Sequence, residues 1–86
     1  MDRALHVTFY TRPGCHLCDD AQAELEHLAK QLPLEISTVD IVRDPAAHNR
    51  WWADIPVIEI GGTILRAPID PARLRLAVLQ GLRAQG

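Results

Sequence analysis

The stretch HVTFYTRPGCHLC, residues 6–18, contains the features of a strand, a breaker and the start of a helix. Its first part, His6 to Thr11, is rich in β-branched and aromatic side chains, and the Arg12-Pro13-Gly14 segment predicts its end. From Cys15 onward, apolar residues recur every three or four positions, which predicts an amphipathic helix that ends before Pro33. We expect its apolar stripe in the core: Leu17, Ala21, Leu25, Leu28, Ala29 and Leu32.

The next segment, Leu34 to Ile41, is β-branched and predicts a second strand. A strand, helix and strand of these lengths favour a parallel, right-handed crossover. Asp44-Pro45 and Asp70-Pro71 each place a capping side chain before a proline that suits the first helical position. Two further helices are therefore expected, a short one and one that reaches about Arg83. The apolar stripe of the last helix is predicted to be Leu74, Val78, Leu79 and Leu82.

A hairpin is predicted between these two helices, because Gly61-Gly62 separates two β-rich segments and glycine permits the positive φ of a tight turn. The segments are residues 57–60 and 63–66. The predicted element order is β-α-β-α-β-β-α, which is an α/β fold.

Length and composition limit the possible classes. A chain of 86 residues has room for one core, so we expect a single domain over residues 1–86. Hydrophobic residues make up 48% and charged residues 23%, which is typical of a globular protein. A formal net charge of -2 disfavours nucleic acid and membrane surfaces as partners. No apolar run approaches the roughly 20 residues of a membrane span, and a soluble, cytoplasmic protein is expected.

Both cysteines lie in Cys15-His16-Leu17-Cys18, where a disulfide would close too short a loop to add much stability. After a strand and at the start of a helix, the first sulfur lies near unpaired N–H groups and the positive helix end, which favour a thiolate. We expect Cys15 to be the exposed nucleophile and Cys18 the more buried resolving residue. Cys15, Cys18 and His16 supply at most three metal ligands, so no metal site is expected.

The TRPGCHLC segment, between its strand and its helix, resembles the active-site segment of the thioredoxin superfamily and is most similar to small glutaredoxin-like proteins. The resemblance implies a four-stranded mixed sheet with helices on both faces, and thiol-disulfide oxidoreductase activity. It makes Pro56 the cis-proline beside the attacking cysteine, with the backbone of Ile55 pairing with an extended peptide or glutathione. It also aligns Arg12 with a basic residue that contacts a glutathione carboxylate.

The chain departs from glutaredoxins in two places. His16-Leu17 stands between the cysteines, and the Gly-Gly-x-Asp element that holds glutathione is missing, although Asp70 could substitute for it. We therefore expect a protein or peptide disulfide to be a better substrate than a glutathione mixed disulfide. No bound cofactor is expected, glutathione is a possible electron donor, and the protein is expected to be a monomer. His16 is either a group that stabilises the thiolate or an ordinary surface residue.

An alternative function is a non-catalytic thioredoxin-fold binding module with a redox-regulatory cysteine pair. Such a module would hold its partner with the Pro56 groove and the Trp51-Trp52 pair. Of these two tryptophans we expect one in the core and one at the surface near the site. Fold alone cannot separate the two functions, because one fold hosts many.

Overall fold

The computed structural model describes residues 3–86, and its secondary structure follows the predicted order. Helix α1 begins directly after its N-cap Cys15, and the other two helices begin at prolines that follow the caps Asp44 and Asp70. Each predicted element is present, with ends that differ from the prediction by at most two residues. The elements are β1 (Leu5–Thr11), α1 (His16–Gln31), β2 (Leu34–Asp40), α2 (Pro45–Trp51), β3 (Val57–Ile60), β4 (Thr63–Arg66) and α3 (Pro71–Gln85).

The four strands form one mixed sheet in the order β2-β1-β3-β4. Strands β1 and β2 are parallel, with Leu5 opposite Leu34, while β3 is antiparallel to both β1 and β4. The β3–β4 turn contains Gly61 at a φ of 58°, the positive value that the Gly-Gly pair predicted. The predicted hairpin and the mixed sheet implied by the resemblance are therefore confirmed.

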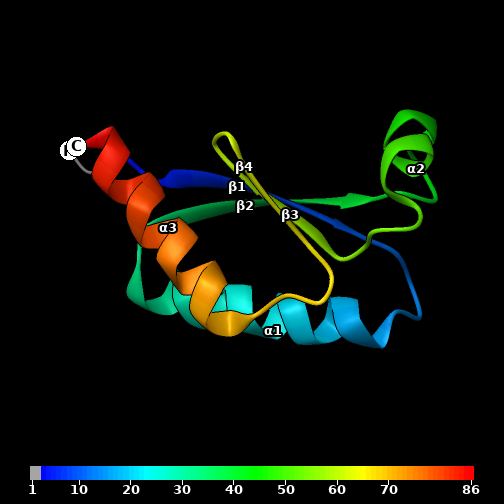
Figure 1. The fold of residues 1–86 in the computed structure, drawn as a ribbon, viewed down its shortest axis with the longest axis horizontal. Helices are drawn as coiled ribbons and strands as arrows, with labels where there is room; N and C mark the ends of the chain where they lie inside the picture. The colour runs from blue at the N-terminus through cyan, green and yellow to red at the C-terminus, as the bar shows by residue number, and fades with distance from the viewer. Residues whose placement is uncertain (1–2) are drawn as a thin grey trace.

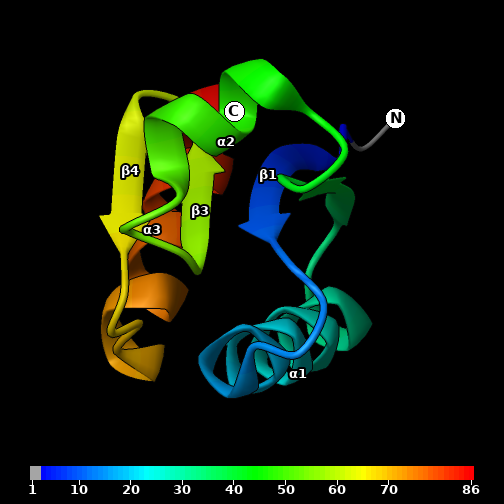
Figure 2. The same cartoon turned by 90° about the vertical axis from the view of Figure 1, so that its right-hand side faces the viewer.

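Helices cover both faces of the sheet, and Figures 1 and 2 show α2 on the opposite side from α1. Alternate side chains of β1, including Val7 and Phe9, point into a core beneath α1 and α3. A smaller core on the other face contains Trp51 of α2 together with Ile41 and Val57, with Tyr10 packed against it. The side chains of one strand therefore reach both cores.

The predicted stripes were partly wrong. Ala21, Leu25 and Leu28 of α1 are buried as expected, but Leu17 is 54% exposed and Ala29 is exposed. The neighbouring Cys18 is buried, as predicted for the second cysteine. A repeat of 3.6 residues locates the middle of a buried stripe, whereas its edges depend on what packs against the helix.

On α3, Leu74 and Val78 are buried and Leu82 is half-buried, as predicted. Leu79, predicted to be in the core, is 37% exposed, and Ala77 is buried in its place. The buried face of α3 is therefore centred on Leu74, Ala77 and Val78, which belong to the larger core.

One end of the molecule gathers several segments that are far apart in sequence. The loop after β1 and the first turn of α1 lie at the same end as α2 and the segment that enters β3 (Figure 1). This follows from the topology, since β3 is antiparallel to β1 and so begins where β1 ends. Within residues 3–86, no helix combines the length and apolar character that crossing a membrane requires.

Candidate redox site

Cys15 lies at the N-cap of α1, in an extended conformation. Gly14, with a φ of 76°, makes the turn that separates it from β1, and few other residues adopt this conformation readily. The Cys15 sulfur accepts a hydrogen bond from the backbone amide of Cys18 over 3.2 Å. Cys15 is partly exposed, so a sulfur that receives a helix N–H bond can also be reached from solvent.

Cys18, one turn further along α1, is buried, with 1% of its surface exposed. Burial is the largest cause of a raised pKa for the Cys18 thiol, and its hydrogen bond and charge interaction with Cys15 act in the same direction. Hydrogen bonds from the Thr11 side chain and the Arg12 backbone oppose this effect but do not outweigh it. Both cysteines are free, so the site is in its dithiol form.

Pro56 is buried at the start of β3, and the Ile55-Pro56 peptide bond is cis, as the resemblance implied. Half-buried Ile55 packs against both hydrophobic cores, and Cys15 packs against one of them. The amide of Ile55 donates to the Trp51 carbonyl over 3.2 Å. The carbonyl of Ile55 accepts no backbone hydrogen bond within residues 3–86.

Arg12 directly follows β1, three residues before Cys15, and His16 is the first residue of α1. Both are exposed. In the described part of the chain, neither side chain forms an ion pair or hydrogen bond with a cysteine. The exposed Arg12 side chain is open to a bound ligand.

The segment before Pro56 is fixed by residues that the sequence analysis did not single out. Arg66 Nε lies 3.8 Å from Asp54 Oδ2, and the Ala67 amide donates to the Asp54 carbonyl over 3.2 Å. The guanidinium of Arg66 also lies 5.5 Å from the Trp51 ring, on which Arg50 stacks at 4.5 Å. The missed signal was the opposite charge of Asp54, shortly before the predicted hairpin, and Arg66, its last residue.

Of the tryptophan pair, Trp51 is 3% exposed and Trp52 is 64% exposed. The expected division into one core and one surface residue is confirmed. The ring of Trp51 packs against Tyr10, with 5.6 Å between ring centroids. Trp51 therefore joins α2 to β1, while Trp52 extends from the end of α2.

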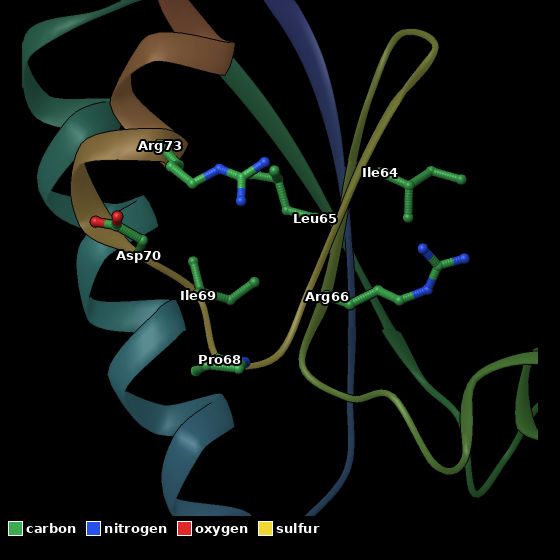
Figure 3. Close-up of a pocket in the computed structure, with 7 residues that line it drawn as sticks. All are labelled: Ile64, Leu65, Arg66, Pro68, Ile69, Asp70 and Arg73. Atoms are coloured by element: carbon green, nitrogen blue, oxygen red, sulfur yellow. The ribbon is translucent and has the colours of Figure 1, made fainter.

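Two pockets flank the loop between β4 and α3, and Pro68 and Ile69 line both. One, of about 230 Å³, lies between β4 and the start of α3 (Figure 3). It includes Asp70, whose Oδ1 accepts from the Ala72 amide over 2.9 Å and so caps its own helix. The other, of about 400 Å³, lies between this loop and α1 and reaches Leu17.

Three or more His, Cys, Asp or Glu side chains are nowhere grouped to hold a metal ion within residues 3–86. The chemistry that the described site offers is that of two thiols. One is accessible at a helix N-terminus, and the other is buried within one turn of it.

Comparison with known proteins agrees with this geometry. Residues 6–80 match the family model of the glutaredoxin-like domain (DUF836). The structure of target protein XcR50 from X. campestris is 31% identical, with a TM-score of 0.72 over 86% of this chain and 96% of that one. No curated protein matches the chain.

Thioredoxins share the fold at lower identity. Thioredoxin 1 from Thermosipho africanus is 11% identical, with a TM-score of 0.76 over 94% of this chain and 98% of that one. Fasciola hepatica thioredoxin is 22% identical, with a TM-score of 0.67 over 93% of this chain and 83% of that one. Fold, family and the Cys15-Cys18 pair together support a redox-type function. The family model spans most of the chain, and the chain therefore belongs to the glutaredoxin-like family (DUF836) of the thioredoxin superfamily.

Proposed function

We propose that the protein is a thiol-disulfide oxidoreductase that reduces protein or peptide disulfides. The single observation that carries the proposal is the contrast between the two thiols of one helical turn. The Cys15 sulfur is accessible and receives the Cys18 amide hydrogen bond, whereas the Cys18 thiol is buried and its pKa is raised by that burial. Cys15 is thereby suited to attack the substrate disulfide, and Cys18 is suited to remain protonated until it resolves the mixed disulfide.

The proposed reaction has two exchange steps. The Cys15 thiolate attacks one sulfur of the substrate disulfide, forming a mixed disulfide and releasing the other substrate sulfur, which takes a proton. Cys18 then loses its proton and attacks Cys15, releasing the second substrate thiol. Two electrons and two protons pass from the cysteine pair to the substrate, and the protein is left with a Cys15–Cys18 disulfide.

Substrate would bind across the end of the sheet where Ile55 and Cys15 border the same core. The Ile55 carbonyl would accept an N–H group from an extended peptide. Regeneration requires a two-electron reductant, for which we propose two glutathione thiols or the dithiol of a reductase. The protein is proposed to work as a monomeric single domain, without a bound cofactor or metal.

A protein disulfide is favoured over glutathione for a local reason. The usual glutathione-binding Gly-Gly-x-Asp element is missing, and the carboxylate of Asp70 is already engaged with its own helix. Arg12 is an exposed cation beside the site that could bind one glutathione carboxylate. One end of the tripeptide would therefore be held and the other would not.

Single-turnover reduction tests the proposal. The reduced protein is mixed with a disulfide-linked peptide, and both released thiols and protein disulfide are measured. The wild type should yield two substrate thiols per protein. Cys15→Ser should yield none, and Cys18→Ser should stop at a mixed disulfide on Cys15, seen as a mass increase.

The same experiment also distinguishes an oxidoreductase from a non-catalytic binding module. Peptide binding without any exchange in the wild type would contradict the proposal and favour a non-catalytic module. Reduction by Cys15→Ser at the wild-type rate would contradict the assignment of Cys15 as nucleophile.

A further inference from the structure

A groove of about 400 Å³ runs along α1 from Leu17, the residue directly before Cys18. One wall is α1 itself, and the other is the loop that joins β4 to α3. Figure 3 shows Pro68 and Ile69 on this loop, beside α1. The lining consists of Leu17, Asp20, Ala21, Ala23, Glu24, Pro68, Ile69 and Pro71.

Leu17 places one end of the groove next to the redox site. This residue lies between the two cysteines, lines the groove and exposes 54% of its surface. From Leu17, the lining continues one and two turns along the helix to Asp20 and Glu24. At 1.5 Å per helical residue, Leu17 and Glu24 are about 10 Å apart along the axis, a span covered by about three residues of extended chain.

The groove combines apolar walls with an acidic rim. Leu17, Pro68 and Ile69 offer apolar surface, and neither of the two lining prolines has an N–H donor. On the helix side, Asp20 and Glu24 face the groove, and neither forms an ion pair within residues 3–86. The helix as a whole is acidic, with Asp19, Asp20, Glu24 and Glu26 against Lys30.

We propose that this groove selects the substrate, by binding an extended segment beside the substrate's reactive cysteine. The segment would place an apolar side chain against Leu17 and Ile69, and a Lys or Arg three or four positions from the cysteine, near Asp20 and Glu24. The inference rests on the proposed oxidoreductase function and adds a substrate class to it. The carboxylates of Asp20 and Glu24 favour a basic segment through charge complementarity, and they repel the carboxylates of glutathione.

A pair of disulfide peptides tests this selection. Both carry an apolar residue next to the reactive cysteine. One peptide has Lys three and four positions from that cysteine, and the other has Glu at the same positions. Each design is made twice, with the charged residues before the cysteine and with them after it. Single-turnover rate constants are measured with the reduced protein at low salt. The wild type should reduce the Lys peptide about fivefold faster on one flank, in keeping with exposed charge pairs, and 0.5 M salt should remove the difference.

Charge variants identify the groove as the source. Asp20→Lys combined with Glu24→Lys should reverse the preference, and Asp20→Asn with Glu24→Gln should abolish it. Glu26→Lys is the matched control, because Glu26 is an exposed acid of the same helix that bonds Gln22 and does not line the groove. This control should retain the preference for the Lys peptide.

The outcomes separate the two proposals when a small neutral disulfide is included. The groove proposal would be overturned by equal rates for the Lys and Glu peptides. It would also be overturned if Glu26→Lys lost the preference as fully as the variants of Asp20 and Glu24. Either result would leave the oxidoreductase function standing. No reduction of either peptide or of the neutral disulfide by the wild type would overturn both.

Discussion

The backbone amide of Cys18 donates a hydrogen bond to the sulfur of Cys15 over 3.2 Å, although only Cys15 is accessible to solvent. The two residues are thus coupled through the backbone of one helical turn while their side chains occupy different environments. This relationship leads directly to the expected order in which the two thiols react.

Alkylation should modify Cys15 first. Iodoacetamide on the reduced, folded protein is expected to label Cys15 and to spare Cys18, because 99% of the Cys18 surface is inaccessible. Mass mapping of peptides after a time course gives the order. Denaturant should allow labelling of both, which is the control, and modification of Cys18 ahead of Cys15 would contradict the assigned roles.

The stability of the reduced protein should fall at alkaline pH. Burial raises the pKa of Cys18 above its ordinary value of 9.0, so the folded state favours the protonated thiol. This contribution is fully present below pH 9.0 and is lost as the pH rises through the folded-state pKa. Urea unfolding at pH 7 and pH 10 should show a larger loss for wild type than for Cys18→Ala. Equal losses would mean that Cys18 does not titrate differently in the folded state.

Arg12→Ala should separate the two classes of substrate. The exposed guanidinium next to the site is expected to bind a glutathione carboxylate. Its removal should raise KM severalfold for a glutathione mixed disulfide and change protein-disulfide reduction little. Arg75→Ala, which removes another exposed charge from α3, is the control in steady-state assays. An equal loss on both substrates would instead indicate an effect of Arg12 on the Cys15 thiolate.

The two adjacent tryptophans should differ sharply in their effect on stability. Trp51→Ala removes a buried ring that packs on Tyr10, and we expect a loss of about 3–5 kcal/mol in the free energy of unfolding. Trp52→Ala removes an exposed ring and should change it by about 0.5 kcal/mol or less. Chemical denaturation of both variants measures the difference, and similar losses would be inconsistent with the observed burial.

Local signals account for the success of the predicted element order. The prolines after Asp44 and Asp70 mark helix starts because both caps bond their own helices, and Gly61 marks the hairpin because its φ is positive. Each signal acts within a few residues of the chain. The cysteine pair was recognisable for the same reason, since a strand, a breaker and a helix surround it.

The contributions of distant segments could not be predicted in this way. Leu17 fits an apolar stripe but lines an open groove, because the loop carrying Pro68 and Ile69 faces it across a gap. The link between Asp54 and Arg66 likewise joins residues separated by a whole hairpin. Periodicity describes one helix at a time and contains no information on what packs against its edges.

The sequence by itself therefore determined the element order, the caps and the position of the cysteine pair at a helix start, because these depend on backbone preferences within a few residues. Only the tertiary structure decided that Leu17 is exposed, that the Ile55 carbonyl has no backbone hydrogen bond among the described residues, and that an acidic groove begins at Leu17. Burial and charge at the site depend on which distant segments meet there, and the packing of the sheet and helices sets those contacts.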